Sequence, residues 1–114
     1  MKYVPKSSAI KFQNSKTCWG LEYPFEDPDI NGAVGIVDGR YPESGFVVNE
    51  KCKEAVYVVS GTGSLTTTTD SVNLAEGDAA LIPAGEPYFF EGKKLTIFMP
   101  CTPAWNPEQH KEIA

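Results

Sequence analysis

Short stretches of apolar and β-branched residues recur along the chain, separated by turn residues, and they predict strands. Ala33–Val37 ends at the turn signal Asp38-Gly39, Phe46 opens a strand that can run to Lys51, and Val56–Val59 is β-branched and aromatic. Further strands are predicted over residues 65–69, 71–74, 79–82, 87–90 and 95–99, with turns at 60–63 and 91–94. No window shows the sustained i, i+3, i+4, i+7 apolar spacing of an amphipathic helix.

The only helix candidate is short and lies near the end of the chain, over residues 106–112. Asn106 is a suitable N-cap and Pro107 suits the first helical position. The chain is therefore expected to hold roughly eight to ten short strands with turns every 8–12 residues, which is typical of a β-sandwich or barrel. A length of 114 residues predicts a single domain, 1–114, with a core that needs no disulfide or structural metal.

Composition narrows the range of partners. The chain carries 10 basic and 15 acidic residues, a net charge of −5, and its predicted pI is about 4.8. A nucleic-acid partner requires a basic face, so no nucleic acid is expected. The beginning of the sequence lacks the apolar stretch of a secretory signal, and no apolar run approaches membrane-spanning length. We therefore expect a cytoplasmic protein that binds no membrane.

The three cysteines, Cys18, Cys52 and Cys101, are far apart in the sequence. Their number is odd and no C-x-x-C pair occurs, so the sequence indicates neither a disulfide framework nor a zinc site. Buried free thiols are the expected state.

Two glycine-containing motifs give the most specific signal. Glu54 is followed after six residues by Gly61, and Gly77 is followed after five residues by Pro83 and then by Gly85. In this order, within a background of strands, the two motifs resemble those of the cupins, which include sugar-binding domains of the arabinose-regulator type. The resemblance implies an all-β fold, a single double-stranded β-helix or jelly-roll barrel. It covers about residues 45–99 and leaves residues 100–114 as a tail.

The chain departs from the cupin pattern at the metal ligands. The family carries a His-x-His pair before the glutamate and a further histidine after the second motif. The second-motif position is Tyr88. The His-x-His positions fall on Val48 and Glu50 with a short spacer, on Val47 and Asn49 with a longer one, or on Lys51 and Lys53 counted forward from Gly45. Of the ligand set that the resemblance implies, only Glu54 remains.

Strand alternation suggests which side chains could form a pocket. Residues 48, 50, 52, 54 and 56 share one face of a strand. If Glu54 points into the barrel, as the family glutamate does, Glu50 and Cys52 point there as well. Tyr88 and Phe90 would face the same cavity from another strand. The candidate ligand-binding residues are therefore Glu50, Cys52, Glu54, Tyr88 and Phe90.

Two carboxylates in one pocket must be paired, protonated or bridged by a cation. Glu50 and Glu54 could hold a divalent metal, act as a general acid–base pair, or bind a polyol or cationic ligand by hydrogen bonds. Alternatively, they pair with Arg40, Lys51 or Lys53 at the barrel mouth. The sequence favours a pocket without a cofactor that binds a sugar or an organic acid. The alternatives are an isomerase, lyase or dioxygenase with a depleted metal site, and a regulatory dimer with a filled barrel.

The remaining candidates lie near the two ends of the chain. His110 is the only histidine, and its polar surroundings predict a solvated side chain, although it could reach the site if the tail folds over the barrel mouth. A small barrel has edge strands to hide, so a homodimer is expected. We expect the segments around Trp19 and Trp105 to form its contact.

Overall fold

The computed structural model describes residues 1–114 and is all-β, as the sequence predicts. The strands are β1 (Ile10–Ser15), β2 (Cys18–Tyr23), β3 (Asn31–Tyr41), β4 (Phe46–Asn49), β5 (Lys53–Thr67), β6 (Ser71–Leu74), β7 (Ala79–Ile82), β8 (Tyr88–Thr102) and β9 (His110–Ile113). Two single 3₁₀ turns, η1 (Lys6–Ser8) and η2 (Pro107–Gln109), complete the chain. Neither is long or apolar enough to cross a membrane.

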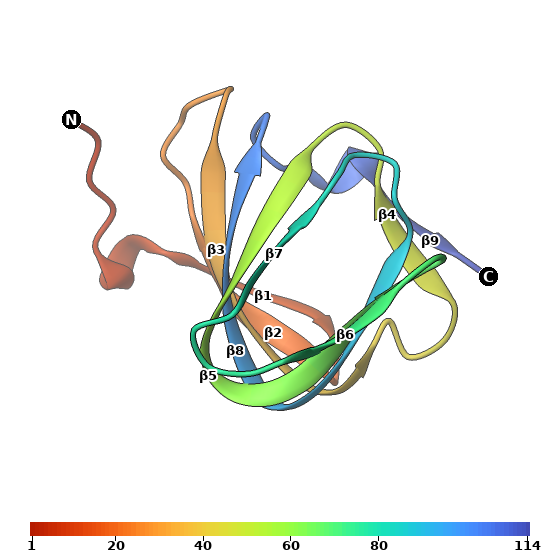
Figure 1. Ribbon diagram of the computed structural model, residues 1–114. Coiled ribbons are helices and arrows are strands. Elements are labelled where there is room, and N and C mark those ends of the chain that lie inside the picture. The colour runs from red at the N-terminus through yellow and green to blue at the C-terminus, as the bar shows by residue number, and fades with distance from the viewer.

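All neighbouring strands are antiparallel and curl into a barrel (Figure 1). The hydrogen-bonded order is β1-β2-β3-β8-β4-β9, and β5 pairs with β6, β7 and β8. The long strand β8 is therefore shared by both halves of the barrel, since it pairs with β3, β4 and β5. The first residues of the chain extend away from the barrel as an arm (Figure 1).

Two predicted turns prove to be bends within long strands. Residues 60–63 lie inside β5 and residues 91–94 lie inside β8. The register of the β5–β8 pair shifts between Val58 and Thr62, and Gly61 takes φ 82° opposite Lys94, at φ 48°. A Cβ on Gly61 would lie 2.2 Å from the Lys94 carbonyl oxygen, so only glycine fits there. These bends let each strand cover two walls of the barrel.

The bends also reverse which residues face inward. In β8 the buried side chains are even-numbered before the bend and odd-numbered after it, and β5 changes in the same way at residues 60–62. The fully buried side chains of the hydrophobic core are Val37, Val47, Val56, Val58, Leu95 and Ile97. They belong to one hydrophobic cluster inside the barrel, and two of them, Val37 and Ile97, also line a cavity.

Both ends of the chain contribute more strand than the sequence predicts. β1 and β2 form a hairpin that pairs with β3, so Trp19 lies opposite Ile36 within the sheet. At the other end, the expected helix is only the single turn η2, after which His110 enters β9 beside β4. The predicted cap is confirmed, because Asn106 Oδ1 accepts a hydrogen bond from the Gln109 backbone N–H at 3.2 Å.

Candidate functional site

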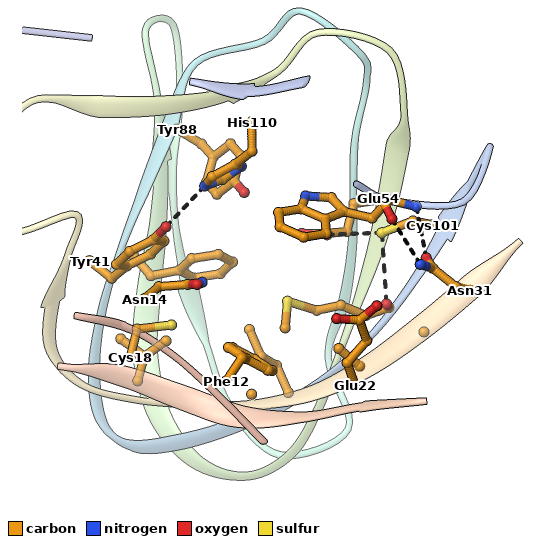
Figure 2. Close-up of a pocket in the computed structure, with 18 residues that line it drawn as sticks. Phe12, Asn14, Cys18, Glu22, Asn31, Tyr41, Glu54, Tyr88, Cys101 and His110 are labelled. Atoms are coloured by element: carbon orange, nitrogen blue, oxygen red, sulfur yellow. Dashed lines mark hydrogen bonds between the residues drawn. The ribbon is translucent and has the colours of Figure 1, made fainter. Parts of the chain in front are cut away.

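A cavity lies inside the barrel and opens at one end. Its volume is about 100 Å³, enough for several waters or a small ligand. Of its 18 lining residues 11 are hydrophobic, so a few polar side chains stand in an apolar wall, as is typical of small-molecule sites. Figure 2 shows two polar groups on opposite sides, with Glu54 and Cys101 on one side and Tyr41, His110 and Asn14 on the other.

The first polar group consists of Glu54 on β5 and Cys101 on β8, which lie opposite each other in the strand register. Glu54 is only 6% exposed, and burial raises the pKa of its carboxyl group from 4.5 to about 7. The Cys101 thiol donates a hydrogen bond to Glu54 Oε2 at 3.0 Å, which lowers that pKa and so opposes part of the burial effect. Glu54 is therefore poised to gain or lose a proton near neutral pH.

Cys101 is a hydrogen-bond donor in this pair and not a nucleophile. The contact with Cys52, burial, and the neighbouring Glu54 carboxyl all raise the pKa of the Cys101 thiol. A thiol that stays protonated is unreactive but can donate to a carboxylate. All three cysteines are buried and free, as expected from the sequence.

Tyr88 and Phe90, two of the candidate ligand-binding residues, line the cavity. Both are buried in β8 and their rings meet edge to face, with centroids 5.6 Å apart. Burial raises the pKa of the Tyr88 phenol well above its ordinary value, so the phenol stays neutral. The pair forms an aromatic wall of the cavity.

Glu50 and Cys52 do not line the cavity, in contrast to the expectation from strand alternation. β4 ends at Asn49 and β5 begins at Lys53, so an irregular turn interrupts the alternation and Glu50 is exposed to solvent. Cys52 is buried behind Cys101. The predicted pocket containing both Glu50 and Glu54 is therefore not formed. No three side chains of His, Cys, Asp or Glu cluster as ligands for a metal ion.

The second polar group joins Tyr41 to His110. The Tyr41 hydroxyl lies 2.9 Å from His110 Nε2, and the planes of the two rings are within 4° of parallel. On its other side, His110 Nδ1 lies 2.7 Å from the side-chain oxygen of Asn49. The prediction of a solvated His110 is thus wrong: the C-terminal segment (residues 103–114) folds over the barrel and brings this histidine to the cavity.

Burial decides the protonation of both members of this pair. It lowers the pKa of His110, against a smaller opposing effect of Glu112, so the imidazole is neutral at pH 7. Burial also raises the pKa of Tyr41, with additional contributions from Cys18, Glu112 and Glu54. The pair is therefore a neutral phenol hydrogen-bonded to a neutral imidazole.

Several further residues that the sequence analysis did not select for the site also line the cavity, among them Glu22, Asn31 and Trp105. Glu22 on β2 supplies a second carboxylate, in place of Glu50, and is partly exposed. Asn31 binds the backbone of Trp105 in both directions, at 2.9 and 3.1 Å. Trp105 also lines the cavity, with its indole 5.6 Å from the His110 ring. The expected homodimer, with contacts through the segments around Trp19 and Trp105, stays a prediction.

Comparison with known proteins identifies the fold. No protein-family model and no curated protein sequence matches the chain. Among solved structures, it is similar to the nucleoside dehydratase Pac13, with a TM-score of 0.85 and 19% identity over 99% of this chain and 92% of that one. It is also similar to the polyketide cyclase RemF from Streptomyces resistomycificus (0.73; 18%; 100% and 86%) and to ectoine synthase from P. lautus (0.72; 11%; 100% and 91%).

The chain has the cupin fold. Burial distinguishes the spacers considered for the cupin histidine positions. Val47 and Asn49 are 0% and 2% exposed, whereas Glu50 faces solvent. Burial therefore favours the longer spacer. In this barrel the side-chain oxygen of the buried Asn49 holds the histidine that arrives from the C-terminal segment.

Proposed function

We propose that this cupin is an acid–base enzyme that acts on a small hydroxylated molecule and that its reaction is a dehydration. The observation that carries the proposal is the Glu54 carboxyl group, buried in the cavity with a pKa of about 7. A general acid is most effective when its pKa lies near the working pH. Tyr41 and His110, facing Glu54 across the cavity, provide a matching acceptor (Figure 2).

The two polar groups suit the two proton transfers that a dehydration requires. Protonated Glu54 gives its proton to the departing hydroxyl group, which leaves as water when the C–O bond breaks. The phenol oxygen of Tyr41 takes the proton from the adjacent carbon, whose C–H electron pair forms the new C=C bond. As it does so, Tyr41 passes its own proton to His110 Nε2. Solvent then returns the proton from the imidazolium to Glu54, which restores the enzyme.

The fold relatives support this reaction class. Pac13 is a nucleoside dehydratase, and variants of it have been crystallised with uridine; they match this chain with a TM-score of 0.86. We propose a nucleoside, or a similar molecule that carries a ring and a sugar, as the first substrate class to test. Apolar walls such as Phe12 and Met99 suit a ring, and Glu22 and Asn31 offer partners for hydroxyl groups.

The test is a ligand and turnover screen on the purified protein. Uridine, other nucleosides, sugars and hydroxy acids are screened by thermal shift and calorimetry, and each mixture is examined by proton NMR for new alkene signals. We expect at least one member to bind and to lose water. Glu54→Gln should reduce turnover about 100-fold or more while binding persists.

Glu50→Gln is the matched control, since Glu50 is an exposed glutamate outside the cavity. It should leave both binding and turnover unchanged. Binding without turnover across the whole panel would mean that the protein binds a ligand but does not catalyse a dehydration, and this would contradict the proposal. Equal turnover by Glu54→Gln and the wild type would contradict the role of Glu54.

A further inference from the structure

Three hydrogen-bond donors from the C-terminal segment converge on one buried oxygen, Asn49 Oδ1. They are Trp105 Nε1 at 3.1 Å, Gln109 Nε2 at 3.2 Å and His110 Nδ1 at 2.7 Å. Asn49 is 2% exposed, and its own amide nitrogen, Nδ2, has no hydrogen-bond partner. A buried orphan donor is costly, so the acceptor function of Oδ1 must outweigh it.

The direction of every hydrogen bond in this network follows from groups that can only donate. The backbone N–H groups of Lys51 and Cys52 both donate to Gln109 Oε1, at 3.1 and 3.2 Å. The Gln109 amide is therefore oriented with its NH₂ group toward Asn49. The indole N–H of Trp105 is also a donor only. Asn49 must consequently present its oxygen, and not its nitrogen, to all three neighbours.

The same logic continues through His110 to Tyr41. An oxygen acceptor opposite Nδ1 requires that Nδ1 carry the imidazole proton. In a neutral imidazole, Nε2 is then the acceptor, and only the Tyr41 hydroxyl is there to donate to it. The phenol proton points at His110, and the lone pairs of the phenol oxygen face the cavity and the side chain of Asn14 in its wall.

We propose that Asn49 is a positioning residue that holds His110 as the Nδ1–H tautomer and thereby makes Tyr41 a proton acceptor toward the substrate. The inference rests on the proposed function for its catalytic meaning, but the tautomer itself is a property of the resting protein. Asn49 also anchors Trp105 and His110, two residues of the cavity wall, through a single atom. Its main-chain oxygen accepts from the Gly85 N–H at 2.7 Å, which ties this anchor to the second cupin motif.

The tautomer can be measured directly because His110 is the only histidine in the chain. In ¹⁵N-labelled protein at a pH where the imidazole is neutral, we expect Nδ1 to show the shift of a protonated nitrogen and Nε2 that of an acceptor. Tyr41→Phe should move the Nε2 signal, because its donor is lost, and leave Nδ1 protonated. A wild-type protein with the proton on Nε2 would overturn the proposal.

Two substitutions of Asn49 separate its acceptor role from a purely structural one. Asn49→Ala removes the acceptor, and we expect loss of the fixed tautomer and a fall in kcat of about 10-fold or more. Asn49→Asp keeps the acceptor oxygen and replaces only the nitrogen that has no partner. It should retain the Nδ1–H tautomer in the neutral imidazole and recover most of kcat. If Asn49→Ala fails to fold, the Asp variant still decides: a proton on Nε2 there contradicts the inference.

Asn73→Ala is the control, since Asn73 is an exposed asparagine on β6, and it should leave the His110 spectrum unchanged. The spectrum of the resting protein also separates this inference from the proposed function. A fixed Nδ1–H tautomer with no turnover of any substrate would contradict the proposed function and support the hydrogen-bond network around Asn49. Turnover by the wild type, with unchanged spectra and rates in Asn49→Ala, would support the proposed function and contradict the positioning role of Asn49.

Discussion

The Glu54 side and the His110 side of the cavity are built from different kinds of structure. Glu54 and Cys101 lie on β5 and β8, two long strands paired along most of their length. His110 lies at the start of the short strand β9, next to η2, and the side chain of Asn49 holds it in place. One side is fixed by the ladder of the sheet, whereas the other is fixed by side-chain hydrogen bonds.

This difference sets the way in which each side controls a proton. Burial in an apolar wall has no direction, and it changes how readily Glu54 ionises. A hydrogen bond has a direction, and it determines on which atom of His110 the proton lies. The site thus combines a carboxyl group controlled through its pKa with an imidazole controlled through its tautomer. Substitutions on the two sides should accordingly change different observables.

The largest expected effect tests the Glu54 side without any substrate. Folding raises the pKa of Glu54 from 4.5 to about 7, so its ionisation in the folded protein costs about 3 kcal/mol. The stability associated with neutral Glu54 is fully present below pH 4.5 and is lost as the pH rises through about 7. Glu54→Gln stays neutral. It should therefore raise the free energy of unfolding by about 3 kcal/mol above pH 7 and have little effect below pH 4.5.

Denaturant unfolding at a series of pH values measures this difference. Glu50→Gln, on the exposed turn, should show no such dependence on pH. Parallel stability curves for Glu54→Gln and the wild type would mean that the carboxyl group is not desolvated. The contrast between the two sides of the cavity would then disappear.

The next effect tests the His110 side. Tyr41→Phe removes the phenol oxygen that accepts the substrate proton in the proposed dehydration, and we expect kcat to fall about 100-fold with little change in KM. This corresponds to about 2.7 kcal/mol of transition-state stabilisation. The control is Tyr57→Phe, because Tyr57 is 48% exposed on the outer face of β5. A change confined to KM would make Tyr41 a substrate-binding residue and leave the acceptor role to another group.

The two sides also differ in how far the sequence predicts them. Glu54 follows from a motif whose glycine has a local physical reason, since Gly61 takes a positive φ where β5 bends. The position of Tyr88 follows from the second motif in the same way. Glu50 was wrongly placed because period-two alternation holds only within a continuous strand, and a turn separates β4 from β5. The turn residues around Lys51 do not reveal this break.

The His110 side depends on contacts between segments that are far apart in the sequence. Asn49 and His110 are 61 positions apart, and Tyr41 and His110 are 69 apart. The capped turn at Asn106 could be predicted, but not the strand β9 that follows it and sets the direction of His110. The cupin histidine positions hold no histidine in this sequence, and this suggested a cavity without an imidazole. The sequence does not show that His110, from the end of the chain, reaches the cavity.

The smallest expected effect concerns the separate contributions of burial and of the Cys101 hydrogen bond to the pKa of Glu54. Cys101→Ala removes the thiol that donates to Glu54 Oε2 and should raise the pKa of Glu54 further. Because the proposed dehydration requires protonated Glu54, the alkaline limb of the kcat/KM profile should move to higher pH by about one unit, equivalent to about 1.4 kcal/mol. Cys101→Ser keeps a donor and should leave the limb near its wild-type position. If both variants shift the limb equally, packing around Glu54, and not the hydrogen bond from residue 101, sets its pKa, and the Glu54 side would be controlled by burial alone.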